Sequence, residues 1–399
     1  MLKKRGKSFF AAHKLLIAIA TLMGTIVGAG ILAIPYVVSQ SGFLIGFIIM
    51  VLLGLGILFL NLLVGEIVLR TKEQHQLTGY AEKYLGKWGK RLMTFSLLFS
   101  LYGALTAYLI GEGETLKAIF HFGNPLWYSL IFFVLTFLII YKGIKAAGKV
   151  ELILIICLLL VITLIGIFSY KDINGNYLTT INLAKFFVPY GVIFFAFIGY
   201  PAIPEMQEEL EQNKSKMKKA IIIGSLIPIV LYLCFTFFVV GIIGLENFEL
   251  LGPNQRIATI ALSMYSSPIL GTFANLIAVL AMFTSFLTIG IALTEVYEYD
   301  YFFSRRKALL LAFSIPLLVT IFKLSTFVTV IAITGAVAGG LEGILIILMY
   351  WKAKFLGERK PEYSLKPRKI LKVLSAILVL MFTLGIIYQI YVNFFKDIY

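Results

Sequence analysis

Few residues in this chain have the chemistry for a functional role, and three of them are carboxylates inside long apolar runs: Glu66, Glu112 and Glu342. A charge in a hydrocarbon layer is costly, so such groups are expected to carry protons or to form a gate. Each also has a structural interpretation. Glu66 can pair with a base such as Arg70. Glu112 can face an aqueous vestibule at the outer end of its helix, and Glu342 can form a buried hydrogen bond.

No constellation of catalytic residues accompanies these carboxylates. The three histidines lie at the ends of apolar runs or in loops, and Cys157 and Cys234 belong to no Cys-x-x-Cys or Cys/His pattern. Spacing of this kind indicates neither a metal site nor a disulfide framework. We therefore expect a protein that is not an enzyme and that uses no cofactor.

The backbone of the first apolar run offers a second kind of chemistry. Residues 24–36 read GTIVGAGILAIPY, with three glycines followed by Pro35. Glycine costs a helix about 1 kcal/mol and proline about 3 kcal/mol relative to alanine, so a break is predicted here. At membrane depth, irregular backbone is tolerated only where it is buried in protein or lines a polar cavity. The break therefore predicts a binding site, and the alternative is close helix packing through Gly24 and Gly28.

A second predicted break lies at residues 194–205, which read FFAFIGYPAIPE. Pro201 and Pro204 each remove a backbone donor and crowd the preceding turn. Free N–H groups at a break attract an anion, and free carbonyls attract a cation, so two such breaks suit a zwitterion. No acidic residue lies between Lys14 and Tyr36, which disfavours a polyamine. The aromatic residues of this stretch either line the site for an apolar side chain or pack in the core.

Composition places these features in a membrane. Hydrophobic residues make up 60% of the 399 residues and charged residues only 14%, with a mean hydropathy of +0.95. A soluble domain has about 25% charged residues. The net charge of +15 comes from bases in short loops, so we expect contact with a lipid bilayer and none with nucleic acid.

Apolar runs predict an all-α protein with eleven transmembrane helices. The predicted spans are 14–38, 43–69, 93–120, 125–141, 150–170, 184–206, 218–244, 269–294, 307–322, 325–350 and 369–395. Alternate connections hold 29 of the 35 Lys and Arg residues, which predicts a cytoplasmic N-terminus and an extracellular C-terminus. Breaks in spans one and six predict two inverted five-helix repeats, 14–170 and 184–350, in a core of residues 1–350. Residues 351–399 then form a cytoplasmic loop and the eleventh helix.

The residues at both breaks resemble a known group of transporters. The stretch 24–36, with Ser41-Gly42-Phe43 after it, is similar to the first helix of the amino acid/auxin permease and aromatic amino acid permease families. Phe197, Pro201 and the sequence at 203–204 and 208–210 resemble their sixth-helix signature, and Thr284-Ser285-Phe286-Leu287 resembles the eighth helix of aromatic amino acid permeases. These families share the leucine-transporter fold, and the resemblance covers residues 14 to about 350.

The resemblance implies a substrate site at the two breaks. The residues at the matching positions are Thr25, Gly28, Ala29 and Gly30 for the carboxylate of an amino acid, and Phe195, Ala196 and Ile198 for its amine. Tyr108, or alternatively Tyr102, is expected to close over the substrate. These assignments follow from the resemblance alone.

A cation site between spans one and eight is implied in the same way. It maps to Gly24, Val27, Ala281, Thr284 and Ser285. Hydroxyls in an apolar helix more commonly bond back to their own helix. Some proton-coupled relatives place a lysine of span five at this cation position, where Cys157 and Leu158 lie here, which favours Na⁺. Aromatic amino acid permeases with a similar Thr-Ser pair are regarded as proton-driven, so both Na⁺ and H⁺ stay open.

Together these features predict a plasma-membrane permease that moves a neutral, apolar or aromatic L-amino acid by symport with Na⁺ or H⁺. Three alternatives remain: a transporter of another small solute such as a nucleobase or polyamine, a channel, and a membrane receptor built on the same fold. A channel would need a continuous polar lining, and a receptor would need a signalling domain. The sequence leaves the oligomeric state open.

Overall fold

A computed structural model of the protein describes residues 2–142, 148–211, 213–266, 268–366 and 369–394. All regular structure within these ranges is helical, as predicted. Six of the described helices are long and apolar enough to cross a membrane, or seven when the bent pair Lys14–Ile26 and Gly30–Ser41 counts as one span.

Helix occupies each predicted span, with the following bounds. Span one holds α1 (Leu2–Ile26) and α2 (Gly30–Ser41), and spans two to five hold α3 (Phe43–Arg70), α4 (Leu77–Phe120), α5 (Pro125–Tyr141) and α6 (Gly148–Phe168). Span six holds α8 (Tyr190–Phe197), η3 (Tyr200–Ala202) and α9 (Ile203–Glu209), and span seven holds α10 (Met217–Leu250). Spans eight to eleven hold α12 (Pro268–Glu295), α13 (Arg305–Ile321), α14 (Phe327–Ile333) with η7 (Thr334–Gly339) and α15 (Gly340–Leu356), and α16 (Lys369–Phe394). Two short helices lie in loops: α7 (Gly175–Leu178) between predicted spans five and six, and α11 (Ala258–Tyr265) between predicted spans seven and eight.

Some of these helices are shorter than the hydrocarbon layer of a membrane. Helices α5 and α13 have 17 residues each, about 26 Å at the helical rise, against a hydrocarbon layer of about 30 Å. The count of eleven spans and the inverted repeats therefore stay predictions.

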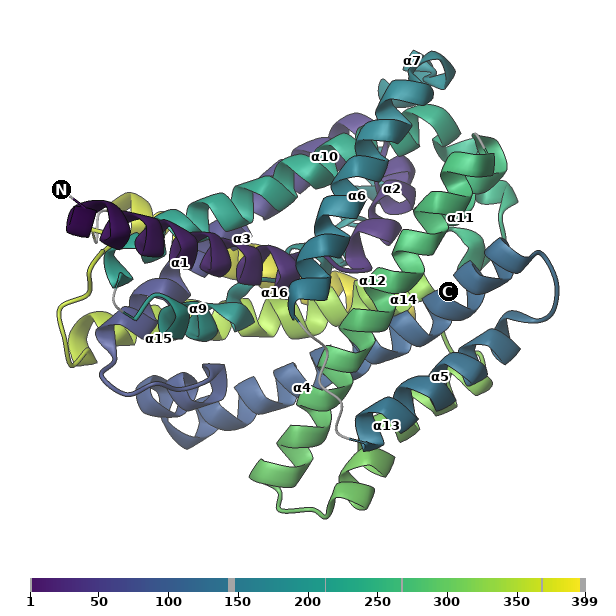
Figure 1. Ribbon diagram of the computed structural model, residues 1–399. Helices are drawn as coiled ribbons and strands as arrows, with labels where there is room; N and C mark the ends of the chain where they lie inside the picture. The colour runs from purple at the N-terminus through teal and green to yellow at the C-terminus, as the bar shows by residue number, and fades with distance from the viewer. Residues whose placement is uncertain (1, 143–147, 212, 267, 367–368, 395–399) are drawn as a thin grey trace.

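Two groups of helices make up the core of the fold, and several further helices contact both groups. Helices α1, α2, α3 and α10 pack together, while α4 packs against α5, α12 and α13. Figure 1 shows α10 running beside α1 and beside α3, and α5 beside α13 on the other side of the molecule. Helix α15 packs against both α3 and α4. It therefore contacts both groups, which matters for Glu342.

Three features of the helices were not predicted. Helix α4 turns at Gly86, where φ is +76°, a conformation that glycine adopts readily. Helix α10 has a similar turn at Gly244. Span ten contains a π-helical segment, η7. Its glycines let a neighbouring backbone approach closely, because a Cβ at Gly335 would lie 2.0 Å from the Gly191 carbonyl oxygen.

Candidate functional site

The predicted break in span one is present and narrow. Helix α1 ends at Ile26, α2 begins at Gly30, and their axes differ by 55°. The Val27 N–H still donates to the Met23 carbonyl at 2.8 Å. Thr25 lies within α1, with an exposed side chain whose hydroxyl donates to the Thr21 carbonyl at 3.0 Å. The irregular backbone is therefore at Gly28 and Ala29, and Thr25 is not part of it.

The second break is also present. Helix α8 ends at Phe197, and the backbone is irregular at Ile198 and Gly199 before η3 begins. The Ile198 N–H donates to the Phe195 carbonyl at 3.3 Å. The proline at 201 then begins a new turn, because it has no N–H to continue the first one.

The two breaks meet, although about 170 residues of chain separate them. A Cβ at Gly30 would lie 2.7 Å from the Ala196 Cα, and a Cβ at Gly199 would lie 2.7 Å from a side-chain carbon of Ile26. Atoms do not approach this closely, so only glycine fits at both positions. The sequence prediction that Gly28, Ala29, Gly30, Phe195, Ala196 and Ile198 surround one site is consistent with this contact.

Tyr108 lies at this junction and Tyr102 does not. A Cβ at Gly28 would lie 3.2 Å from the Tyr108 hydroxyl and 4.0 Å from the Ser285 Oγ. The Tyr102 hydroxyl instead pairs with the Tyr297 hydroxyl at 2.7 Å. Spans one, three and eight therefore converge at Gly28, and Tyr108 is the tyrosine positioned to contact a molecule bound there.

The predicted cation ligands are less closely grouped. The Thr284 hydroxyl donates to the carbonyls of Ala281 and Leu280 in its own helix, at 3.1 and 3.3 Å. This is the common role of a hydroxyl in an apolar helix. Ser285 is near Gly28, whereas these two hydrogen bonds of the Thr284 hydroxyl stay within α12. The cation site stays a prediction.

The sequence did not indicate one residue of this site, Tyr232. Tyr232 of α10 is fully buried, and its hydroxyl donates to the Ile26 carbonyl at 2.8 Å. That carbonyl ends the inner half of span one, where we expected a free acceptor. A single tyrosine in an apolar helix gives no spacing signal, so only the fold identifies its role.

Most aromatic side chains of the second break pack in the core and do not line the junction. Phe194 contacts Phe382 of α16, with ring centroids 5.2 Å apart, and Phe197 stacks on Tyr232 at 5.1 Å. Phe195 is the one that approaches Gly30, with its ring 3.2 Å from the position of a Cβ there. The sequence left open whether these aromatic residues line the site or pack in the core. In the structure Phe194 and Phe197 pack against other rings, while Phe195 lies beside Gly30.

Glu342 is fully buried on α15 and has two hydroxyl donors. The Tyr200 hydroxyl donates to its Oε2 at 2.6 Å and the Ser100 hydroxyl to its Oε1 at 3.2 Å. Tyr200 belongs to the second break and Ser100 to α4. The buried hydrogen bond that we gave as the structural interpretation is present.

Glu112 is also fully buried, and neither carboxylate oxygen has a hydrogen-bond partner among the described residues. The expectation that it faces an aqueous vestibule is wrong in this conformation. It lies one helical turn beyond Tyr108 on the same face of α4, where neighbouring helices cover it.

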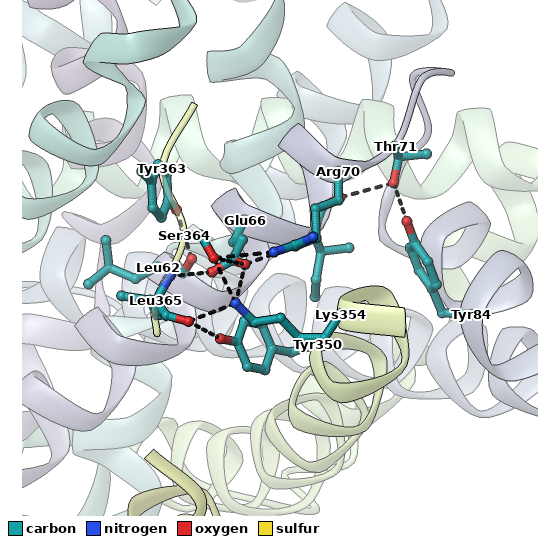
Figure 2. Close-up of polar contacts among 11 residues, drawn as sticks. Leu62, Glu66, Arg70, Thr71, Tyr84, Tyr350, Lys354, Tyr363, Ser364 and Leu365 are labelled. Carbon is teal, nitrogen blue, oxygen red and sulfur yellow. Dashed lines mark hydrogen bonds and ion pairs between the residues drawn. The ribbon is translucent and has the colours of Figure 1, made fainter. Parts of the chain in front are cut away.

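Glu66 is the centre of a polar cluster at the end of α3, drawn in Figure 2. Its carboxylate accepts from four groups: Arg70 Nε at 2.8 Å, Lys354 Nζ at 2.5 Å, Ser364 Oγ at 3.0 Å and the Leu365 N–H at 2.7 Å. Pairing with Arg70, the structural interpretation, is confirmed. The cluster also fastens the loop before α16 to α3 and α15.

Comparisons with known proteins identify the family of this chain. The chain matches the tryptophan/tyrosine permease family over residues 11–390. It is 28% identical over 350 residues to the tyrosine-specific transport system 1 of Haemophilus influenzae, covering 83% of this chain and 86% of the relative. It is 28% identical over 282 residues to the glutamine transporter 2 of Aliivibrio fischeri, covering 68% and 72%.

A solved structure gives the fold. MhsT, crystallised in complex with L-phenylalanine, superposes with a TM-score of 0.64 over 94% of this chain and 98% of MhsT, at 16% identity. At this sequence identity, the likeness to MhsT shows a shared fold and nothing further. The fold agrees with the leucine-transporter fold that the resemblance implied. Because the family match extends over nearly the whole sequence, the chain belongs to the tryptophan/tyrosine permease family.

Proposed function

We propose that this protein is a secondary active transporter that moves a neutral L-amino acid, apolar or aromatic, across the plasma membrane by ion-coupled symport. Membership of a permease family makes it a transporter rather than an enzyme, as the sequence predicted. The observation that carries the substrate proposal is the contact between the two helix breaks at Gly30 and Ala196, with Tyr108 beside Gly28. Backbone N–H and carbonyl groups at such a junction suit a zwitterion.

The proposed roles follow from this geometry. The substrate carboxylate binds backbone N–H groups at Gly28, Ala29 and Gly30, and the substrate amine binds carbonyls at Phe195, Ala196 and Ile198. Tyr108 closes over the bound molecule, and Phe195 contacts its side chain. Relatives named for tyrosine and for glutamine support an amino acid substrate and leave its side chain to be measured.

The proposed architecture has eleven spans, in two inverted repeats of residues 14–170 and 184–350, with a cytoplasmic N-terminus. Alternating access arises when spans one, two, six and seven rock against the other spans around the junction. The coupling ion is Na⁺, bound near Gly24, Val27, Ala281, Thr284 and Ser285, or H⁺.

Uptake into proteoliposomes tests this function. We expect labelled aromatic or apolar amino acids to accumulate under an inward Na⁺ or H⁺ gradient and not without one. Thr284→Ala tests the cation site, and Thr383→Ala is its matched control, because the Thr383 hydroxyl also bonds to its own helix but on the exposed face of α16. Absence of uptake for every amino acid, with uptake of a nucleobase or polyamine, would contradict the proposal.

A further inference from the structure

The three intramembrane carboxylates lie in three different chemical environments. Glu66 contacts two cations, and Glu342 contacts hydroxyl groups. The oxygens of Glu112 have no hydrogen-bond partner among the described residues. A group that carries a proton through a transport cycle must be tolerated both with and without its charge. The three environments differ sharply in this respect.

Glu66 is paired with two cationic side chains. Lys354 Nζ and Arg70 Nε both donate to Oε1, and the Leu365 N–H donates to Oε2 at 2.7 Å. Protonation would leave two cations facing a neutral group in a site where the carboxylate is fully buried. Breaking a buried pair in this way is strongly unfavourable, so Glu66 suits a structural role.

Glu112 suits its neutral form. An ionised carboxylate that is fully buried and has no donor loses its hydration without compensation. In the described residues, no charged group acts on Glu112, and both oxygens lack a donor. It can release a proton only after water enters.

Glu342 is satisfied in both forms. When ionised, it accepts from Tyr200 at 2.6 Å and from Ser100 at 3.2 Å. When a proton binds Oε1, the new O–H can donate to the Ser100 oxygen, and the Ser100 hydroxyl can turn to the carbonyl four residues earlier in α4, a common bond for serine in a helix. Tyr200 continues to donate to Oε2. No donor or acceptor is lost in either state.

We infer that Glu342 binds and releases the proton that is coupled to transport. The inference rests on the proposed function and selects H⁺ as its coupling ion. Protons come from water on the side where the site is open and leave to water on the other side, so no further reactant is required. Glu342 contacts no substrate in this arrangement. It acts through Tyr200, which begins η3 two residues after Ile198, a proposed ligand of the substrate amine.

The position of Glu342 links the two groups of helices. Tyr200 is part of the second break, and Ser100 is part of α4. One turn before Glu342, the Ala338 carbonyl accepts from Ser96 of α4 at 2.8 Å. Protonation reverses the bond between Glu342 and Ser100 while the bond to Tyr200 stays. Protonation therefore changes the hydrogen bonding by which Glu342 links Tyr200 of span six to Ser100 of span three. In the proposed mechanism, these two spans move relative to each other during alternating access.

No opposing charge lies near Glu342 from the elements that pack against α15. Helix α3 presents Glu66 and Arg70, which pair with Lys354, 12 residues and about 18 Å further along α15. Helix α16 presents Phe382 against Gly343, and α4 presents the two serines. Tyr190 of α8 is the titratable group beside Tyr200. The nearest ionisable groups to Glu342 are therefore these tyrosines.

The experiment compares Glu342→Gln with wild type in proteoliposomes by two measurements, accumulation under an inward H⁺ gradient and exchange of labelled for unlabelled amino acid without a gradient. Glutamine resembles the protonated side chain and carries no exchangeable charge. We expect accumulation to fall to equilibrium, a ratio of inside to outside of about one, whereas exchange stays within about threefold of wild type. Glu114→Gln is the control, an acidic residue on the same helix as Ser100 that lies outside the proposed site. It should accumulate substrate normally.

Three outcomes would overturn this inference and leave the proposed function standing. The first is accumulation by Glu342→Gln, and the second is wild-type accumulation that requires Na⁺ and does not depend on pH. The third is loss of proton coupling in Glu112→Gln while Glu342→Gln is unaffected. Wild-type protein that neither exchanges nor accumulates any amino acid would refute the proposed function itself.

A second variant keeps the test valid if Glu342→Gln fails to fold. Tyr200→Phe removes a donor to the ionised carboxylate, so protonation becomes easier. The pH at which H⁺-driven uptake falls to half should move upward by about one unit. An unchanged pH profile in Tyr200→Phe would overturn the inference, because a purely structural role for this bond would lower activity without moving the profile.

Discussion

The hydroxyl of Tyr232 donates to the carbonyl of Ile26 at 2.8 Å, across the contact between α10 and the inner half of span one. This carbonyl has lost its helical partner because the chain bends after it. The bond therefore stabilises the break while joining spans one and seven, two of the helices proposed to move together.

Tyr232→Phe should destabilise the protein by about 1–2 kcal/mol, because the buried Ile26 carbonyl loses its donor. Thermal unfolding in detergent measures the effect. Tyr391→Phe, at an exposed position of α16, is the control and should unfold as the wild type does. Equal stability of the two variants would show that the Ile26 carbonyl finds another donor.

Gly30→Ala should reduce amino acid uptake about tenfold or more while the protein still inserts in the membrane. The new Cβ would lie 2.7 Å from the Ala196 Cα, so the two breaks must separate. Gly175→Ala is a suitable control because nothing lies within 4 Å of its added Cβ. Unchanged uptake in Gly30→Ala would show that the close contact of the breaks is not required for transport.

Lys354→Met should lower the free energy of unfolding by up to about 3 kcal/mol, because the buried Glu66 carboxylate loses one of its two cations. The loss stays at the low end of the range for buried pairs because Arg70 remains. Denaturation in detergent measures it, with Lys352→Met, an exposed lysine on the same helix, as the control. A similar loss of unfolding free energy in both variants would mean that removing any lysine charge destabilises the protein, whether or not the lysine contacts Glu66.

Glu358 predicts a pH dependence of stability. A hydrogen bond from Lys83, and then one from the Lys72 N–H, hold the pKa of this exposed carboxyl below its usual 4.5. A depressed pKa in the folded state stabilises the protein above the unfolded value, and that contribution disappears as the pH falls through the folded value.

Glu358→Gln should therefore unfold at a lower temperature than wild type at neutral pH, and the difference should disappear as the pH falls below 4.5 and through the lower folded-state pKa of Glu358. Thermal unfolding across this range measures it. Glu73→Gln, a neighbouring acidic residue in the same part of the protein, controls for loss of a negative charge. A difference that persists at low pH would mean that Glu358 contributes through contacts that do not depend on its charge.

The sequence alone determined that this is a helical membrane protein with broken helices in spans one and six. Glycine and proline weaken a helix wherever they lie, and apolar runs of about 20 residues have few places outside a bilayer. The same local rules placed Glu66 next to Arg70, four residues away on one helix face.

The tertiary structure decided what these features do together. Which tyrosine faces Gly28, how Tyr232 caps the Ile26 carbonyl, and which carboxylate has cations, hydroxyls or no partner all depend on contacts between helices far apart in the chain. Sequence patterns report on the periodicity of one helix and not on the rotation of its neighbour. Glu66, Glu112 and Glu342 look alike in an apolar sequence, and only packing against different helices gave them different chemistry.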